Sequence, residues 1–279
     1  MSNTILITGS STGIGRACAK HFHANGWNVI ATMRRPENET ELNALDNVLV
    51  TRLDVQDLAS ISSAISAGKD RFGKIDALLN NAGYGLMGSF ESITRESIQR
   101  QYEVNVFGLF DVTRAILPHF RENRNGVILN VSSVGGRITF PLISPYHSTK
   151  WAVEGFSESL QYELAPIGIK VKLIEPGGVH TDFGGRSMDF QHDEKLAEYN
   201  ELVGKLFAAF QDPSRTESYS TAEYAAEKIY AATIDESSQL RYIVGADAEQ
   251  LLGARYSMDD DAFFGMMRGQ MGIEAEAAQ

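Results

Sequence analysis

The sequence is poor in cysteine, in positive charge and in long apolar runs. Its 279 residues contain one cysteine, Cys18, which excludes an internal disulfide, and no Cys/His cluster has the spacing of zinc ligands. Lys and Arg number 25 against 36 Asp and Glu, and the net charge of -11 argues against a nucleic-acid partner. No apolar run approaches the length of a membrane span, and residues 1–4 lack the basic segment of a signal peptide. The composition therefore predicts a cytoplasmic protein with no metal site, no membrane span and no nucleic-acid partner.

What the chain does have is a regular alternation of strand-like and helix-like segments. Short apolar runs predict buried strands at 5–7, 28–32, 48–53, 75–79, 126–131, 169–175 and 241–244. Helical patterns cover 14–24, 60–72, 95–120 and 145–164. Such alternation is typical of a parallel sheet between two helical layers. We therefore expect an α/β protein: a single Rossmann-type doubly wound parallel sheet of about seven strands with helices on both faces.

One long segment, 181–220, breaks this rhythm. It combines loop and helix, and segments of this kind in compact enzymes often form lids over a substrate. We expect residues 1–246, with this lid included, to form one Rossmann-type domain. The tail, 247–279, is rich in Met, Phe and acidic residues. It is expected to pack on the domain or on a partner subunit.

A glycine cluster, Thr-Gly-Ser-Ser-Thr-Gly-Ile-Gly at 8–15, lies between the first strand and the first helix. Glycines there permit a tight turn and let the backbone approach a pyrophosphate, while the helix offers its free N–H groups. An ordinary strand-to-helix turn is the alternative. The candidate cofactor residues of this cluster are Gly9, Ser11, Thr12, Gly13, Ile14 and Gly15.

The end of the second strand indicates which dinucleotide binds. An acidic residue about 20 positions after the glycines normally holds the ribose 2′-hydroxyl of NAD, but here Arg34 and Arg35 follow the strand. Guanidinium groups suit the 2′-phosphate of NADP(H), although both could be solvated loop charges. After the third strand, Asp54 is placed to accept a hydrogen bond from the adenine amino group, with Val55 beside it. The alternative for Asp54 is a place at a helix N-terminus.

Tyr146 and Lys150 stand four residues apart on a predicted helix, so their side chains share one face. A nearby ammonium favours the phenolate and lowers the pKa of a tyrosine. The pair therefore predicts a tyrosine that exchanges protons at physiological pH. Taken alone, a solvated helix face would explain the spacing as well.

Together these motifs resemble the classical short-chain dehydrogenases/reductases over essentially the first 245 residues. The matching motifs, in the order and spacing of that family, are residues 8–15, Asn80-Asn81-Ala82-Gly83, Asn105, Ser132-Ser133, Tyr146-x-x-x-Lys150 and Pro176-Gly177. Residues 29–36 and 133–136 are similar to the branch that includes 17β-hydroxysteroid and retinol dehydrogenases.

The resemblance implies a role for each matching residue. Tyr146 is the general acid in carbonyl reduction and the base in alcohol oxidation. Ser133 hydrogen-bonds the substrate oxygen, Lys150 holds the nicotinamide ribose, and Asn105 supports a water that links Lys150 to solvent. Each could instead be an ordinary cap, turn or helix residue. The further cofactor-binding positions are Asn81, Ala82, Gly83, Pro176, Gly177, Val179 and Thr181, of which the last two meet the nicotinamide carboxamide.

The sequence as a whole predicts an NADP(H)-dependent oxidoreductase that interconverts a secondary alcohol and a ketone or aldehyde, with reduction favoured. Phe183 and Met188, which flank a Gly-Gly pair in the lid, favour a small apolar substrate, and Tyr84, Leu86, Phe140 and Leu142 are further candidates to line its pocket. The alternatives are a non-catalytic NADP-binding sensor or scaffold, an NAD-dependent alcohol dehydrogenase of the same family, and an epimerase or dehydratase. The resemblance also implies a homodimer or homotetramer built on 95–120 and 145–164.

Overall fold

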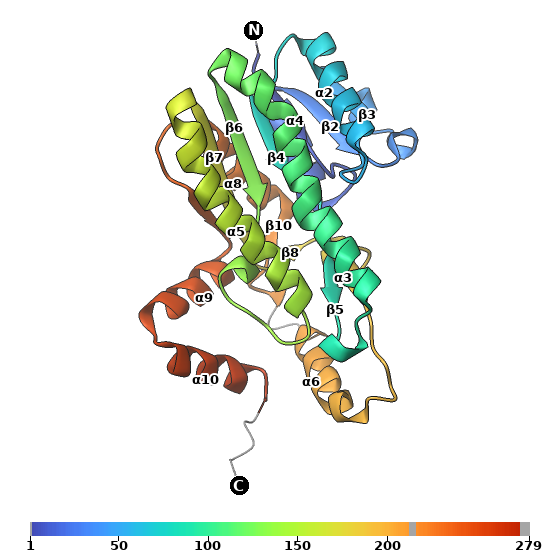
Figure 1. Cartoon of the computed structure of the whole chain (residues 1–279), viewed down its shortest axis with the longest axis vertical. Coiled ribbons are helices and arrows are strands. Elements are labelled where there is room, and N and C mark those ends of the chain that lie inside the picture. The colour runs from blue at the N-terminus through green and yellow to red at the C-terminus, as the bar shows by residue number, and fades with distance from the viewer. Residues whose placement is uncertain (1, 212–215, 274–279) are drawn as a thin grey trace.

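A seven-stranded parallel sheet forms the centre of the protein (Figure 1). The structure is a computed structural model that describes residues 2–211 and 216–273. The strand order is β11-β7-β6-β4-β1-β2-β3. Because this order reverses between β1 and β4, the carboxyl ends of the strands open a crevice there, where dinucleotides bind in doubly wound folds. The predicted α/β fold is confirmed. The strands are β1 (Thr4–Ile7), β2 (Asn28–Met33), β3 (Val48–Arg52), β4 (Ala77–Asn80), β6 (Gly126–Val131), β7 (Ile169–Pro176) and β11 (Arg241–Val244).

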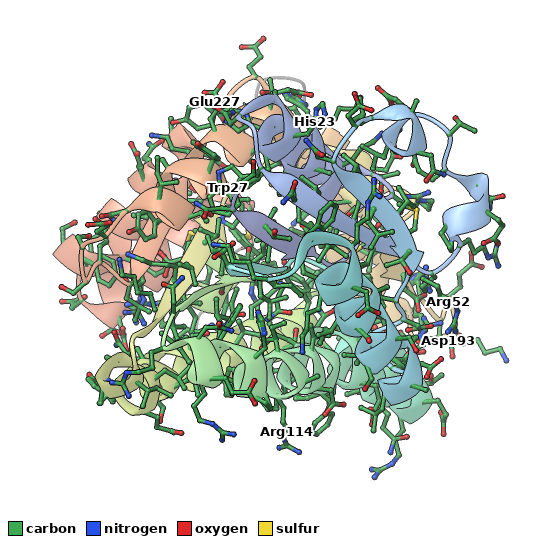
Figure 2. All side chains as sticks on the ribbon, turned by 90° about the horizontal axis from the view of Figure 1, so that it is seen from above. His23, Trp27, Arg52, Arg114, Asp193 and Glu227 are labelled. Atoms are coloured by element: carbon green, nitrogen blue, oxygen red, sulfur yellow. The ribbon has the colours of Figure 1, made fainter. Side chains whose placement is uncertain are left out.

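Helices cover both faces of this sheet, as the view in Figure 2 shows. Successive strand side chains point to opposite faces, so Ile5 and Ile7 pack under one layer and Leu6 under the other. Both faces are buried, which explains why the strands are continuous apolar runs. One layer is α1 (Gly13–Ala24) and α8 (Ala222–Ile234); the other is α2 (Leu58–Phe72), α4 (Gly108–Asn123) and α5 (Ser144–Leu164). Among the helices described, none is both long and apolar enough to cross a bilayer.

The long helix predicted over 95–120 is interrupted, and this part of the prediction is wrong. The segment divides into α3 (Arg95–Tyr102), a π-helical turn over Glu103–Phe107 and α4. A π-turn adds one residue to the helical repeat and is often found at functional sites. Here it buries Asn105, whose exposure is 2%.

Residues 181–220 are tied to the domain by two short ladders. At one end β8 (Val179–His180) pairs with β10 (Ser220–Thr221), and within the segment β9 (Met188–Phe190) pairs with β5 (Gly85–Met87). Helix α6 (Asn200–Gln211) lies between β9 and β10 in the chain, and residues 212–215 lie outside the described part. The predicted lid is therefore anchored on both sides of the loop that joins β8 to β9.

The C-terminal extension forms α9 (Ala246–Ser257) and α10 (Asp260–Gln270). Phe263 and Met267 of α10 are buried in a cluster with Val134 and Ile138, which follow β6. In its described residues the extension thus packs on its own domain; residues 274–279 lie outside them. The division at residue 246 stays a prediction.

Candidate active site

The glycine cluster forms a cradle at the carboxyl end of β1. Gly9 and Gly13 have φ angles of 73° and 56°, in the left-handed region that favours glycine. At Gly15 a Cβ atom would lie 2.4 Å from the carbonyl oxygen of Gly9 and 2.5 Å from Nδ2 of Asn81. The first N–H groups of α1 have no acceptor within the helix and point into this cradle. The cradle therefore suits the pyrophosphate of a dinucleotide, as predicted for residues 9–15.

Asn81 and Thr8 hold the cradle to β4. The Thr8 hydroxyl accepts hydrogen bonds from the backbone N–H groups of Asn81 and Ala82, both at 3.0 Å. In return, Asn81 Nδ2 donates to the carbonyl oxygens of Thr8 and Gly9, at 2.9 and 3.2 Å. Gly83 follows, and a Cβ there would lie 3.2 Å from Oδ1 of Asn105. The predicted residues 81–83 thus lie beside the glycine cluster.

The end of β2 carries two exposed cations. Arg34 and Arg35 make no ion pair with the described residues. Arg16, by contrast, is bound by Glu39 at 2.5 Å and by Glu41 at 2.6 Å. The strong Arg16–Glu39 hydrogen bond lowers the pKa of that carboxyl, so it stays ionised. Arg34 and Arg35 are the cations left available at this end of the crevice.

Asp54 and Val55 follow β3, as predicted, but Asp54 does not cap α2. That position belongs to Asp57, whose Oδ1 accepts from the N–H groups of residues 59 and 60. Helix α2 therefore begins at Leu58, two residues before the predicted start. Asp54 is half-buried and accepts from the N–H of Gln56 at 3.1 Å, and Val55 is buried.

Tyr146, Ser133 and Lys150 meet at the carboxyl end of β6. Tyr146 lies in the first turn of α5 and forms a side-chain hydrogen bond with Ser133. The Lys150 ammonium is buried, donates to the carbonyl of Val131 at 2.8 Å and lies 5.7 Å from the Tyr146 ring centroid. Ser133 Oγ is fixed in turn by the N–H of Gly135 at 3.0 Å. The structure thus brings two hydroxyls and one ammonium together from two elements.

Burial is the largest influence on the pKa values of Tyr146 and Lys150. It raises the pKa of Tyr146 to about 12, while the hydrogen bond from Ser133 acts in the opposite direction. Burial also lowers the pKa of Lys150 to about 8, opposed by the charge of Glu154 one helical turn away. The net shift of the Tyr146 pKa is therefore upward, opposite to the direction predicted from the Lys150 charge alone. Tyr146 holds its proton at neutral pH.

Asn105 is joined to α5 through Thr149. Its Nδ2 donates to Thr149 Oγ1 at 3.2 Å and to the carbonyl of Tyr84 at 2.9 Å, and its Oδ1 accepts from the N–H of Tyr84 at 3.1 Å. The amide therefore fixes the chain after β4 against the residue that precedes Lys150. The role in a water relay predicted for Asn105 stays a prediction.

The loop after β7 is braced by the C-terminal extension. Asp247 of α9 accepts from the N–H of Gly178 at 2.7 Å, and a Cβ at Gly177 would lie 2.3 Å from its Oδ2. The carbonyl oxygen of Pro176 lies 3.5 Å from Ser133 Oγ. Val179 and Thr181 follow, and the Thr181 side chain would lie 3.4 Å from a Cβ at Gly13. This loop therefore reaches the glycine cluster. Asp247 is a site residue that sequence reasoning missed, because it lies 69 positions from its partner.

His147 is a second residue that sequence reasoning missed. It is buried, its Nε2 accepts from the N–H of Phe140 at 2.7 Å, and its Nδ1 lies 2.7 Å from the carbonyl of Gly135. Because Nε2 must accept, Nδ1 carries the proton and donates to that carbonyl, so the ring is neutral. Burial lowers the pKa of His147, which keeps it neutral. Its place beside Tyr146 in the sequence was the available signal.

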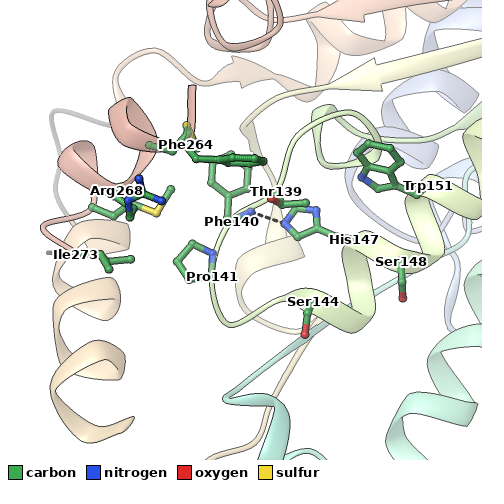
Figure 3. Close-up of a pocket in the computed structure, with 12 residues that line it drawn as sticks. Thr139, Phe140, Pro141, Ser144, His147, Ser148, Trp151, Phe264, Arg268 and Ile273 are labelled. Carbon is green, nitrogen blue, oxygen red and sulfur yellow. Dashed lines mark hydrogen bonds between the residues drawn. The ribbon is translucent and has the colours of Figure 1, made fainter. Parts of the chain in front are cut away.

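A pocket of about 610 Å³ lies between the start of α5 and α10 (Figure 3). It is lined by Phe140, His147, Trp151 and residues of α10, among them Phe264 and Arg268. Neither Tyr146, Lys150 nor Ser133 lines it. Phe140 thus lines a pocket, and its place in the substrate site stays a prediction. Leu86 is fully buried.

The loop that joins β8 to β9 contacts Tyr146 through Phe183. The Phe183 ring centroid is 5.8 Å from that of Tyr146, and the Met188 sulfur would lie 2.7 Å from a Cβ at Gly85. Tyr84 accepts a hydrogen bond from Arg100 at 3.2 Å, and Arg100 is also paired with Asp189. The Phe183 ring thus gives Tyr146 an apolar neighbour on this side.

Comparison with known proteins assigns the family. A family model described as short chain dehydrogenase matches residues 3–191. Over 241 residues the chain is 43% identical to an uncharacterized oxidoreductase of Schizosaccharomyces pombe, a match that covers 86% of this chain and 100% of that protein. A crystal structure of a short-chain dehydrogenase from Streptomyces avermitilis is similar with 34% identity and a TM-score of 0.82, over 98% of each chain. The structure of ElxO with NADP bound is similar with 25% identity and a TM-score of 0.72, over 92% of this chain and 100% of that one. The chain is thus an oxidoreductase and belongs to the classical short-chain dehydrogenase/reductase family, whose members use a nicotinamide cofactor.

Proposed function

We propose that the protein is an NADP(H)-dependent reductase that converts an apolar ketone or aldehyde to the alcohol, with Tyr146 as general acid. The observation that carries this proposal is the hydrogen-bonded pair of Tyr146 and Ser133 beside the buried ammonium of Lys150. Two hydroxyl donors that converge at one point can both reach a substrate carbonyl oxygen.

The chemistry follows from charge. The bound nicotinamide cofactor supplies the hydride. As negative charge develops on the carbonyl oxygen, Ser133 and Tyr146 stabilise it by hydrogen bonding, and Tyr146 then transfers its proton to that oxygen. A pKa raised to about 12 keeps Tyr146 protonated at neutral pH, which suits an acid and therefore reduction. The Lys150 ammonium stabilises the phenolate that results.

The preference for NADP(H) rests on Arg34 and Arg35. Both are exposed after β2 without a carboxylate partner in the described structure, whereas Arg16 is already neutralised by Glu39 and Glu41. A 2′-phosphate offers the oxygens that a guanidinium binds best. The NADP bound by ElxO supports the same choice.

The substrate class rests on the lid. Phe183 and Met188 present apolar surface near Tyr146, and Arg100 is already engaged by Asp189 and Tyr84. An apolar substrate therefore fits this side of Tyr146. The similarity of residues 29–36 to the 17β-hydroxysteroid and retinol dehydrogenase branch stays a prediction, and it directs the choice of test substrates.

The test is oxidation of NADPH in the presence of ketosteroids, retinal, aryl ketones and small aldehydes, with Tyr146→Phe beside the wild type. We expect turnover that is lost in Tyr146→Phe while NADPH still binds. Arg34→Ala should raise the KM for NADPH at least about tenfold and leave that for NADH unchanged, since a charged hydrogen bond contributes about 1.5–3 kcal/mol. Binding of NADPH without turnover of any carbonyl would instead support a non-catalytic sensor.

We further propose a cytoplasmic homodimer or homotetramer built on 95–120, which comprises α3, the π-turn and most of α4, and on 145–164 in α5. Large apolar side chains are exposed along this side: Phe107 at 49%, Trp151 at 48% and Tyr162 at 72%. Light scattering of the purified protein tests the assembly. A monomer at micromolar concentration would contradict it.

A further inference from the structure

The loop that joins β8 to β9 spans the two ends of the active site. Residues 182–187, here called the lid loop, begin next to Thr181 at the glycine cluster and end where Gly85 donates to the carbonyl of Ser187 at 2.8 Å. Within the loop, Phe183 contacts the Tyr146 ring and Arg186 donates to the Thr12 hydroxyl at 2.5 Å. One short segment therefore contacts both the catalytic tyrosine and the cradle for the cofactor phosphates.

Arg186 lies in an environment that lacks an anion. Thr12 is the residue that precedes α1, where the helix dipole is positive and a cation is unfavourable. The one hydrogen bond that the described structure gives Arg186 joins it to a neutral hydroxyl, and no carboxylate of the described residues pairs with it. A guanidinium has five donors in a planar fork that fits two phosphate oxygens. Arg186 is exposed to solvent, and cation and helix terminus together favour an anion between them.

We propose that Arg186 binds the pyrophosphate of the dinucleotide cofactor and holds the lid loop closed over it. This inference rests on the proposed function only in that a dinucleotide occupies the glycine cradle. With the cofactor bound, the guanidinium would exchange part of its contact with Thr12 for hydrogen bonds to the phosphate groups. Phe183 is then fixed against Tyr146, so cofactor binding shapes the apolar substrate site.

The backbone of the lid loop permits such a movement. A Cβ atom added at Gly184 would meet no atom within 4 Å, and one at Gly185 would meet only a backbone oxygen at 3.8 Å. Neither glycine is therefore held in place by close side-chain packing. On either side, the ladders β8·β10 and β5·β9 fix the ends of the segment.

Calorimetric titration of the full chain with two ligands tests the proposal. NADP⁺ contains the pyrophosphate. Adenosine 2′-monophosphate has no pyrophosphate, but it keeps the 2′-phosphate and the adenine that Arg34 and Asp54 would bind. We expect Arg186→Ala to raise the Kd for NADP⁺ at least about tenfold. The Kd for adenosine 2′-monophosphate should stay within about twofold of the wild-type value. The Kd of Arg186→Lys for NADP⁺ should lie between those of the wild type and Arg186→Ala, because lysine keeps the charge and lacks the planar guanidinium. Arg95→Ala, an exposed arginine at the start of α3, is the matched control.

A second measurement follows the loop itself. Phe183 is 36% exposed, and NADP⁺ should protect the bond after it from chymotrypsin in the wild type and much less in Arg186→Ala. Equal NADP⁺ affinity in the wild type and Arg186→Ala would overturn the inference, as would an equal loss for both ligands. A raised KM for a substrate carboxylate with unchanged NADP⁺ affinity would also overturn it. If the wild type binds neither ligand, the proposed function itself fails.

Discussion

Alanine at Gly15 is the sharpest test of the cofactor cradle. The added methyl group would lie 2.4 Å from the carbonyl oxygen of Gly9 and 2.5 Å from Nδ2 of Asn81. Neither atom is free to move, since the Asn81 amide is held by the carbonyls of Thr8 and Gly9 at 2.9 and 3.2 Å. The carbonyl would have to retreat by about 1 Å to reach an ordinary contact. Such a shift opens the turn that binds the pyrophosphate.

The magnitude follows from two opposing effects. Overpacking in a close-packed site costs about 1–3 kcal/mol, whereas glycine to alanine in a helix gains about 1 kcal/mol. Gly253, in α9, has no atom within 4 Å of an added Cβ and serves as the matched control. Gly15→Ala should therefore lose up to about 2 kcal/mol of unfolding free energy, and Gly253→Ala should gain about 1 kcal/mol. For a chain of this size these changes shift Tm by a few degrees in opposite directions.

Thermal unfolding and NADPH titration, run on both variants, check this prediction. We expect Gly15→Ala to bind NADPH at least about tenfold more weakly, because the displaced loop no longer presents its N–H groups at the phosphates. Gly253→Ala should bind NADPH as the wild type does. Wild-type NADPH affinity in Gly15→Ala would refute the close approach of α1 to the loop, and with it the cradle.

Three further predictions concern residues around the site. His147→Ala leaves the buried N–H of Phe140 and the buried carbonyl of Gly135 without their partner. It should lower the free energy of unfolding, measured in urea, by about 2–4 kcal/mol. An unchanged value would show that these two hydrogen bonds do not stabilise the fold. Asp247→Asn weakens the acceptor for the Gly178 N–H and should raise the NADPH Kd about three- to tenfold. Glu249→Gln, in the same helical turn, should leave this Kd unchanged. Equal Kd values for the two variants would contradict the role of Asp247 in holding the loop after β7. Because burial lowers the pKa of Lys150 to about 8, the buried charge costs stability at neutral pH, and this cost is relieved as pH rises through 8 toward the unfolded value of 10.5. The wild type should therefore gain on the order of 3 kcal/mol relative to Lys150→Met across that range, and parallel urea-unfolding curves would show that Lys150 is not desolvated.

Much of the fold could be predicted because its determinants are local. Continuous apolar runs such as 5–7 and 126–131 identify strands that are buried on both faces, and their alternation with helices indicates a parallel sheet. The ends of the helices are predicted less well than their existence. Asp57, not visible as a cap from periodicity alone, starts α2 at Leu58. The π-turn at Glu103–Phe107 leaves the helical pattern almost unchanged, because it inserts only one residue into the repeat.

Part of the candidate site is likewise encoded in short, local stretches of sequence. The glycines at 9–15 and the pair Tyr146 and Lys150 are each contained in one short stretch, so the sequence by itself determined which groups lie together and what chemistry they offer. Backbone freedom at glycine and the i, i+4 spacing of a helix do not depend on the rest of the chain.

Tertiary structure decided the contacts between distant segments and the charge state of the tyrosine. Asp247 meets Gly178 across 69 positions and Arg186 meets Thr12 across 174, and only the order of strands in the sheet brings them together. The pKa of Tyr146 rises because packing removes water from the phenol, and the spacing to Lys150 contains no information about that desolvation. Local chemistry is encoded residue by residue, whereas burial is a property of the folded whole.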